Sequence, residues 1–550
     1  MSTILVKLPS GKSVEYPIYT TGLTILKDLN PETSSIDDVA VVLINGQIYS
    51  LNDPIDINCT FKPVAFNTSI GCDVYRRSLC YAVAMVASEL WPTRRLIISH
   101  SIGHGLYYYF DGVETTNDDI IALNNRLQQL SKDALPIYRK TLAYEEAVEH
   151  FKQAGLSQTV LLLEHKNEPR VYVSTCGNYF DLWYAPLVQN TSALSVFSIE
   201  KYQEGLLIRY PDSKDPSSLP PFVDNPVLYK VYKEHNQWGA CLDVNCVGDL
   251  NHLICKGNIK DFIMVSEALH DGKTAAIADK VPSSCKLVCI CGPSSSGKTT
   301  FCRKLSIALR ARGWKPISIS LDDYYVNRVD TPLDEDGNWD FEVVDALDLK
   351  LLNNDLVELF KGKTIRLPKF NFKTGIREEG GLLTLPEKGV LIIEGIHGLN
   401  PRLTEKVPDD VKFKIFISPL TQLNIDDHNR ISTSDNRLIR RMVRDKQFRG
   451  YSAEETFEMF PRVRRGEDLY IYRYQGDADA VFNSALDYEI SVLKVLAVPL
   501  LQQIKPSSIY YSEARRLLDF LSHFDAIMND DVPSNSLIRE FIGGGCFNVH

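Results

Sequence analysis

The eight residues Gly292-Pro293-Ser294-Ser295-Ser296-Gly297-Lys298-Thr299 constrain this chain more than any other segment. They match the pattern GxxxxGK[ST] and lie between an apolar run, Lys286–Cys291, and a stretch with helical periodicity, Thr299–Arg312. A strand, a Gly-rich turn and a helix in this order direct backbone N–H groups at an anion. The sequence therefore predicts a loop that holds the phosphates of a nucleoside triphosphate.

Each residue type in this loop has an expected part in holding a triphosphate. Lys298 is expected to reach the β- and γ-phosphates, and the Thr299 hydroxyl to ligate Mg²⁺. The remaining contacts to the nucleotide are expected from the backbone and hydroxyl groups of Gly292, Ser294, Ser295, Ser296, Gly297 and Thr300.

Two carboxylates follow apolar strands in the same region. Asp322 comes after the alternating run 316–321, and Glu394 stands near the end of the run 390–395. Residues 286–500 alternate between strand and helix patterns, which predicts a parallel, doubly wound sheet. Ligands bind at the carboxyl ends of such strands, where one carboxylate can accept a hydroxyl proton and another can bind Mg²⁺.

Four arginines recur at helical spacing: Arg437, Arg440, Arg441 and Arg444. This spacing places them on one helical face, and a solvated basic surface is one interpretation. Beside a phosphate-binding loop, the spacing favours a lid that neutralises the transferred phosphoryl group. Arg449-Gly450 extends the cluster into a predicted hinge.

Six segments in order resemble the uridine kinase/phosphoribulokinase family: CICGPSSSGKTT, SLDDYY, DFEVVDALD, LPKFNF, VLIIEG and RLIRRMVRD. The resemblance spans about residues 287–493 and implies ATP and Mg²⁺ as cofactors. It implies Asp322 as the base for a nucleoside 5′-hydroxyl, Glu342 as the carboxylate facing the ribose, and Glu394 near Mg²⁺. It also implies Arg441, Arg444 and Arg449 as phosphate-binding lid residues, with Tyr325 on the substrate side.

The acceptor side departs from this family at four positions. Glu342 stands where uridine kinases have Asp, and Tyr451 where an Arg is expected. Phe370 and Gly375 replace a Tyr and a His of the base pocket, although Phe370 and Phe372 could stack on a base or pack in the core. Uridine or cytidine is the first candidate acceptor, and phosphoribulokinase-like or pantothenate-like hydroxyl substrates remain open.

The first part of the chain has two further resemblances. Residues 3–16 predict a β-hairpin, followed by a helix at 24–29, a strand at 39–44 and a strand at 48–51. This layout, with LVKLPSGKSVEYP and VLINGQIYSLNDPI, resembles the β-grasp TGS domain of threonyl-tRNA synthetases and some GTPases. Residues 71–208 begin with an amphipathic helix and resemble the editing domain of threonyl- and alanyl-tRNA synthetases through HSIGH and FDLWYAPLVQNT.

The editing family holds a metal with an HxxxH pair and a later Cys and His. His100 and His104 lie four residues apart and could share a helical face. Trp183 and Leu187 stand where the other two ligands are expected, and neither side chain can bind zinc. Zinc is therefore not expected in this domain, editing hydrolysis is expected to be lost, and the two histidines are interpreted as structural.

Together these patterns predict a multidomain α+β and α/β protein. The expected domains are a TGS-like β-grasp domain (1–65), an editing-like α+β domain (70–210), a helical connector (222–283), a P-loop kinase-like domain (284–500), and a C-terminal helix with a docking tail (501–550). A last helix is expected at 512–528. Twelve scattered cysteines and no apolar run near ~20 residues favour a cytoplasmic protein with reduced thiols.

Two other functions remain open from the sequence. One is an RNA- or tRNA-binding protein with a regulatory P-loop, although a net charge of −10 is unfavourable for coating nucleic acid. The other is a GTPase, for which no NKxD motif follows the loop. The sequence leaves open the oligomeric state and the role of the front domains.

Overall fold

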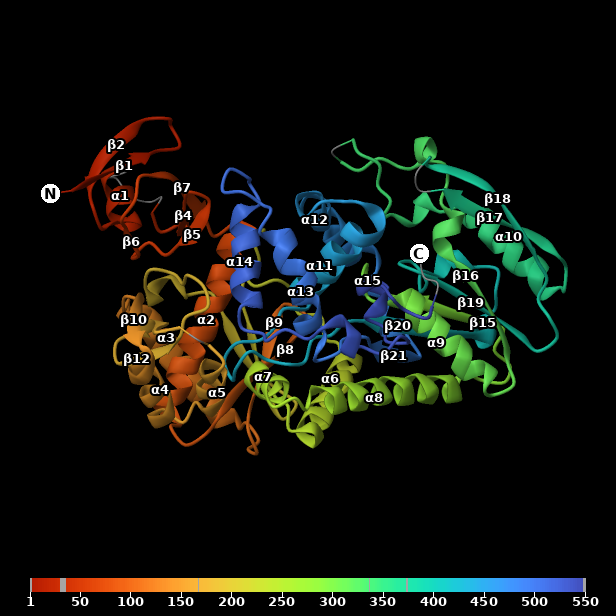
Figure 1. Cartoon of the computed structure of the whole chain (residues 1–550), viewed down its shortest axis with the longest axis horizontal. Coiled ribbons are helices and arrows are strands. Elements are labelled where there is room, and N and C mark those ends of the chain that lie inside the picture. The colour runs from red at the N-terminus through yellow and green to blue at the C-terminus, as the bar shows by residue number, and fades with distance from the viewer. Residues whose placement is uncertain (1, 30–35, 167, 336, 372–373, 548–550) are drawn as a thin grey trace. The chain divides into compact units, whose positions relative to one another are not determined.

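The computed structural model of the chain describes residues 2–29, 36–166, 168–335, 337–371 and 374–547 (Figure 1). They divide into two compact units, each built from three stretches of the chain. The first unit comprises Met1–Lys256, Gln422–Ile431 and Val498–Asp525; the second comprises Gly257–Thr421, Ser432–Ala497 and Ala526–His550. No helix in the described residues is long and apolar enough to cross a membrane. The domain boundaries drawn from the sequence remain predictions.

The first unit opens with a five-stranded sheet in the order β2-β1-β7-β4-β5. The predicted hairpin is confirmed, since β1 pairs antiparallel with β2 and Val6 faces Val14. Ile25 and Leu26 of the short helix α1 are buried against this sheet's core. The elements are β1 (Thr3–Lys7), β2 (Ser13–Pro17), β3 (Thr20–Thr21), α1 (Gly22–Leu29), β4 (Val39–Ile44), β5 (Gln47–Tyr49), β6 (Pro54–Ile55) and β7 (Cys59–Ala65).

The rest of the first unit packs a long helix, α2 (Ser69–Leu90), with two antiparallel sheets ordered β13-β14-β9-β8 and β10-β11-β12. The Thr68 hydroxyl caps α2 by accepting the Gly71 N–H at 3.0 Å. The other elements are β8 (Leu96–Ile102), β9 (Gly105–Phe110), α3 (Asn117–Asp133), β10 (Tyr138–Ala143), α4 (Tyr144–Gln153), α5 (Ser157–Glu164), β11 (Arg170–Cys176), β12 (Tyr179–Leu182), η1 (Thr191–Ala193), β13 (Ser198–Tyr202), β14 (Gly205–Arg209), α6 (Pro226–Leu242), α7 (Val247–Cys255) and α14 (Tyr511–Leu521).

The second unit is built on a five-stranded sheet in the order β16-β19-β15-β20-β21, and every neighbouring pair is parallel. This confirms the parallel sheet predicted from the alternating pattern. Its central strand β15 is buried at every residue, as its apolar sequence requires. The sheet strands are β15 (Leu287–Cys291), β16 (Lys315–Ser320), β19 (Gly389–Gly395), β20 (Lys412–Ser418) and β21 (Ala480–Asn483).

Helices and a separate hairpin complete the second unit. Helix α9 packs against β15, β16 and β19, while β17 and β18 form an antiparallel pair. These elements are α8 (Ile259–Lys280), α9 (Lys298–Arg310), η2 (Leu321–Tyr324), η3 (Arg328–Asp330), η4 (Val344–Ala346), α10 (Leu349–Phe360), β17 (Ile365–Asn371), β18 (Ile376–Leu383), η5 (Pro401–Thr404), η6 (Asp409–Val411), α11 (Thr433–Arg444), η7 (Asp445–Arg449), α12 (Ala453–Tyr470), η8 (Tyr472–Asp477), α13 (Glu489–Leu501, whose last turn belongs to the first unit), η9 (Asn529–Asp531) and α15 (Arg539–Ile542).

The helix expected at 512–528 is too long. Helix α14 ends at Leu521, and residues 523–525 instead bond to a side chain of α7. Asn251 donates to the His523 carbonyl at 2.8 Å and accepts the Asp525 N–H at 2.9 Å. This tertiary contact competes with helical hydrogen bonds and has no signature in the local sequence.

Candidate active site

The phosphate-binding loop lies between β15 and α9, as the sequence predicts. Ser295 and Gly297 have positive φ angles of 59° and 83°, which turn the backbone around the start of the helix. The hydroxyls of Ser295 and Ser296 are buried and have no hydrogen-bond partner among the described residues. Two orphaned hydroxyls beside a helix N-terminus fit a triphosphate, because its oxygens would satisfy them.

Lys298 and Thr300 already have protein partners. The Lys298 ammonium donates to the Gly292 and Pro293 carbonyls, each at 2.9 Å. The Thr300 N–H and hydroxyl both donate to Glu540 Oε2, at 3.0 and 2.9 Å. Thr299 is half-buried beside them.

The two strand-end carboxylates lie at the same edge of the sheet. Asp322 is in η2, directly after β16, and Glu394 of β19 pairs in register with Ser320 of β16. Burial raises the pKa of Asp322, while Lys298 opposes that shift. Burial and the nearby Asp322 raise the pKa of Glu394 to about 7. Asp322 and Lys298 both act on the pKa of Glu394, and Lys298 also acts on that of Asp322, so the three side chains lie near one another.

Glu342 borders a cavity of about 730 Å³. Arg441 borders it too, together with the aromatic side chains Trp339, Phe341 and Tyr470. Burial, followed by Glu467, raises the pKa of Glu342 to about 8, while Arg441 and Lys298 oppose the shift. A cavity of this size, lined by both aromatic and charged side chains, can hold a polar small molecule.

The four same-face arginines of α11 divide into two pairs. Arg437 is buried in an ion pair with Glu467 and donates to the Ser294 carbonyl at 3.1 Å. Arg440 is buried in an ion pair with Glu489 and donates to the Ser295 carbonyl at 3.3 Å. Arg437 and Arg440 therefore hold the loop through its carbonyls. Because both are buried in ion pairs, they form neither a solvated basic face nor part of a four-arginine lid.

Arg441, Arg444 and Arg449 gather around the fully buried Asp445. Arg441 Nε lies 3.2 Å from Asp445 Oδ2, and Arg444 Nη2 donates to Asp445 Oδ1 at 2.8 Å. Arg449 Nη1 lies 3.5 Å from the same carboxylate. Arg441 also donates to the Ser294 hydroxyl at 2.8 Å. Burial, followed by Arg444, lowers the pKa of Arg449 to about 10.

The positions expected to face a base lie in different environments. Tyr325 and Phe370 are buried together in the core, with ring centroids 5.6 Å apart, and Tyr325 donates to the Phe341 carbonyl at 3.1 Å. A methyl group built on Gly375 would lie 2.8 Å from Arg328, whose guanidinium stands 5.9 Å from the Trp339 ring centroid. Tyr451 is exposed, and Phe372 lies outside the described residues.

Three carboxylates of this site were not predicted: Glu467, Asp445 and Glu540. Glu467 accepts the Ser294 N–H at 2.9 Å, although the two residues are 173 positions apart. Glu540 is 240 positions from Thr300. Only Asp445 carried a local signal, since it follows Arg441 by four residues on the same helical face.

The histidine pair of the first unit does not share a helical face. His100 lies in strand β8 and the exposed His104 in the turn after it, because alternating apolar residues there form a sheet edge with β9. The His100 ring stacks on Tyr232 with centroids 3.6 Å apart, and Nδ1 is 2.8 Å from the Ser99 hydroxyl. Burial, followed by Arg430, lowers the pKa of His100 well below its ordinary value.

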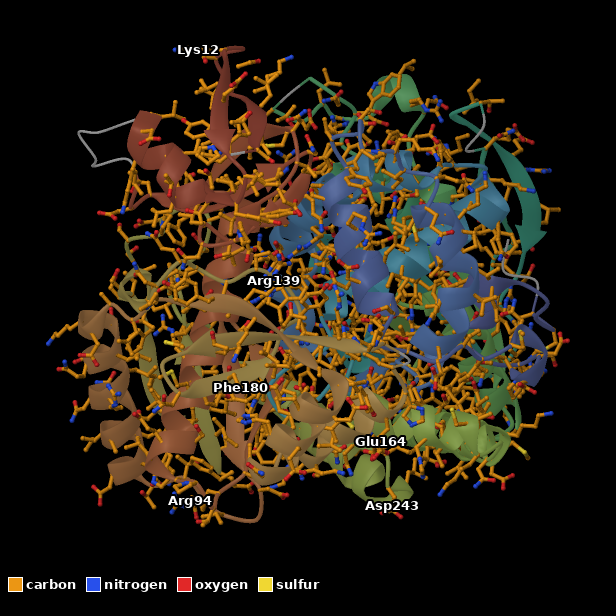
Figure 2. All side chains as sticks on the ribbon, turned by 60° about the vertical axis from the view of Figure 1, so that its left-hand side comes forward. Lys12, Arg94, Arg139, Glu164, Phe180 and Asp243 are labelled. Carbon is orange, nitrogen blue, oxygen red and sulfur yellow. The ribbon has the colours of Figure 1, made fainter. Side chains whose placement is uncertain are left out.

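Trp183 and Leu187, which stand where the editing family has metal ligands, pack against other side chains of the first unit. Trp183 packs against Arg139 (labelled in Figure 2), and the Arg139 guanidinium lies 5.3 Å from a ring centroid of Trp183. Leu187 is buried in the core around α2.

One match to known proteins covers the segment that contains the phosphate-binding loop. Residues 287–491 match the model of the Phosphoribulokinase / Uridine kinase family. The match covers less than half of the chain. Among solved structures, the chain is similar to D-glycerate 3-kinase from Cryptococcus neoformans var. grubii (15% identity, 49% of this chain, 90% of that one, TM-score 0.23). It is also similar to a "Possible Uridine Kinase" from Bacillus stearothermophilus (20% identity, 36% of this chain, 88% of that one, TM-score 0.25).

The N-terminal region matches another class of protein. It is similar to threonine–tRNA ligase from Francisella tularensis subsp. novicida, with 25% identity over 199 residues. The same ligase from subsp. tularensis matches at the same identity and length. The match covers 36% of this chain and 31% of the ligase, so the chain spans about a third of the length of these curated relatives. It fits the TGS-like and editing-like domains.

Proposed function

We propose that this protein transfers the γ-phosphate of ATP to a hydroxyl group of a small molecule, with a nucleoside 5′-hydroxyl as the leading acceptor. The observation that carries the proposal is the convergence of Lys298, Asp322 and Glu394 beside the loop, with Glu342 and Arg441 bordering the adjoining cavity. Phosphoryl transfer depends mostly on positioning and electrostatics, and this set supplies both.

Asp322 is proposed as the base that accepts the hydroxyl proton. Burial raises its pKa toward the working pH, which improves a carboxylate as a proton acceptor. Lys298 reaches the phosphates after leaving the Gly292 and Pro293 carbonyls, and Arg441, Arg444 and Arg449 lie where they can stabilise the transferred charge. Thr299 and Glu394 would hold Mg²⁺, which neutralises phosphate charge when bound.

The acceptor is proposed to occupy the cavity beside Glu342. This carboxylate can hydrogen-bond vicinal hydroxyls such as those of a ribose, and Trp339 offers an aromatic wall for a base. Arg328 fills the space that a side chain at 375 would need, so base recognition would differ from that of uridine kinases. Uridine and cytidine come first, and a phosphoribulokinase-like sugar alcohol is the alternative.

The test incubates the purified chain with ATP, Mg²⁺ and a panel of nucleosides, ribulose 5-phosphate and pantothenate. ADP formation that depends on a pyrimidine nucleoside is the expected result. Turnover with another hydroxyl compound would support the proposed kinase activity and would show that the acceptor is not a pyrimidine nucleoside. ATP binding without turnover on any acceptor, together with tight tRNA binding, would favour the RNA-binding alternative.

A further inference from the structure

Three side chains from distant parts of the first unit converge on one point outside the kinase-like site. His165 follows α5, Cys255 ends α7, and Asp525 lies four residues beyond α14. His165 Nδ1 is 3.4 Å from Cys255 Sγ and 3.3 Å from Asp525 Oδ2, and Sγ is 3.5 Å from the same Oδ2. We propose that His165, Cys255 and Asp525 bind a Zn²⁺ ion, at a site separate from the HxxxH position where zinc is not expected.

The triangle of donor atoms has the dimensions of one face of a zinc tetrahedron. Metal–ligand distances of about 2.0–2.3 Å at tetrahedral angles put neighbouring N, O and S donors about 3.3–3.6 Å apart. The three observed separations lie within that interval. The mixture of imidazole, thiolate and carboxylate suits Zn²⁺, whereas Mg²⁺ and Ca²⁺ prefer oxygen ligands alone.

The geometry also argues against a Cys–His–Asp catalytic triad. In a triad, the nucleophile and the carboxylate contact opposite nitrogens of the imidazole. Here Cys255 and Asp525 both approach Nδ1 of His165, which brings all three donors to a common centre.

The ligands are held in place by the surrounding fold. The Asn251 side chain bonds the backbone at His523 and Asp525, which fixes the carboxylate next to the end of α7. Cys255 is exposed, so the fourth coordination position can take water, and His252 stands one helical turn before it. The Cys255 thiol would release its proton to solvent on binding. The ion would then join segments 90 and 270 residues apart.

The experiment strips the full chain with a chelator and titrates it with Co²⁺, then with Zn²⁺. The expected result is a near-ultraviolet thiolate-to-cobalt band that saturates at about one ion per chain and is displaced by Zn²⁺. The Cys255→Ser variant should lose the band, and His165→Ala should weaken Co²⁺ binding at least tenfold. The matched controls Cys546→Ser, at another exposed cysteine, and His104→Ala should bind as wild type does.

A wild-type chain with no thiolate band, or a band that survives Cys255→Ser, would overturn the site. Melting of the wild type with and without Zn²⁺ gives a second readout that needs no variant. A rise in melting temperature on adding Zn²⁺, absent in Cys255→Ser, is expected. An unchanged melting temperature in the wild type would contradict the proposal.

A separate observation concerns the C-terminal tail of the second unit. Glu540 of α15 accepts both the N–H and the hydroxyl of Thr300, in the first turn of α9. Leu537 lies directly against Gly297, and a methyl group on that glycine would be 2.8 Å from Leu537 Cγ. The geometry points to an autoinhibitory contact in which the tail competes with the nucleotide phosphates. This inference rests on the proposed function.

The competition follows from charge and from the number of donors. A first-turn N–H and an adjacent hydroxyl are the groups a helix start offers to a phosphate, and here one carboxylate uses both. A phosphate close to Glu540 would also bring two anions together in a buried site. Glu540 already contributes to the raised pKa of Glu394. Nucleotide binding at Thr300 therefore requires the tail carboxylate to leave.

The C-terminal tail is held to the second unit by contacts other than the Glu540 carboxylate. Phe541 is fully buried, with the Arg440 guanidinium 5.0 Å from its ring centroid, and the Ser536 hydroxyl is 3.3 Å from the Tyr488 hydroxyl. These contacts hold Glu540 against α9 without involving the carboxylate itself. Replacing only the carboxylate charge should loosen the competition and leave the anchor in place.

The test measures ATP affinity by calorimetry for the wild type, Glu540→Gln and the matched exposed control Asp530→Asn. Glu540→Gln should bind ATP roughly tenfold more tightly, the scale of one charge-assisted hydrogen bond. Asp530→Asn should match the wild type. Equal affinity in all three chains would overturn the autoinhibitory contact and leave the proposed function standing. Absence of ATP binding in every chain would instead contradict the proposed function.

Discussion

The two compact units hold the residues of their family motifs in opposite ways. In the second unit, the motif side chains converge at one sheet edge, with orphaned serine hydroxyls and carboxylates whose pKa values are raised. In the first unit, His100 stacks on Tyr232, and Trp183 and Leu187 pack where metal ligands are expected. The contrast teaches that a retained motif indicates a fold, while chemistry requires polar atoms that the fold leaves available.

The largest expected effect is a loss of turnover when Asp322 is replaced. It tests whether the second unit carries out chemistry at all. Asp322→Asn keeps the side-chain size and removes the proton acceptor, so kcat should fall about 10²- to 10⁴-fold. ATP affinity should stay within twofold, because Asp322 is not among the residues expected to hold the nucleotide. Steady-state kinetics and calorimetry check both. Wild-type turnover in this variant would show that another group takes the proton.

The next effect concerns the buried pair that braces the loop. Arg440→Met leaves the buried Glu489 carboxylate without the arginine that neutralises its charge. This variant should lower the free energy of unfolding by about 3–5 kcal/mol. Denaturant unfolding measures the loss, with Arg464→Met, at an exposed arginine, as the matched control. The double variant Arg440→Met/Glu489→Met should recover most of the stability. A loss no larger than the control's would mean that the pair does not stabilise the loop region.

A smaller effect is expected in the first unit. His100→Phe preserves an aromatic ring against Tyr232 and removes a side chain that is neutral in the folded state, so stability should change by less than about 1.5 kcal/mol. Kinase activity should be unchanged. Thermal melting and turnover assays check these outcomes. A metal that is bound by the wild type and lost in His100→Phe would show that the histidine motif of the first unit is also available for chemistry.

The last prediction is a pH dependence of stability at Glu342. Burial raises its pKa to about 8 from an ordinary value of 4.5, so between these values the folded chain holds a proton that the unfolded chain has released. The contribution of this group to stability therefore falls as the pH rises toward 8. Glu342→Gln cannot lose that proton. Its melting temperature should exceed the wild type's at pH 8.5 and approach it at pH 5. A difference that does not change with pH would contradict the raised pKa.

Local patterns in the sequence were sufficient for the phosphate-binding loop, the parallel sheet, the first hairpin and the strand-end positions of Asp322 and Glu394. These features depend on residues close together in the chain, where periodicity and glycine placement are visible. The spacing of Arg437, Arg440, Arg441 and Arg444 was visible too, but their division into two that pair with Glu467 and Glu489 and two that pair with Asp445 was not. That division depends on Glu467 and Glu489, which belong to other helices.

The sequence alone determined that a triphosphate loop and a synthetase-like front share this chain. Only the tertiary structure decided that Glu540 reaches Thr300, that His100 packs on Tyr232, and that His165, Cys255 and Asp525 meet. Each of these contacts joins segments far apart in the chain, and their pairing is selected by packing of the whole unit rather than by local preference. A motif fixes which groups are offered, and the packing around it decides which of them stay available for chemistry.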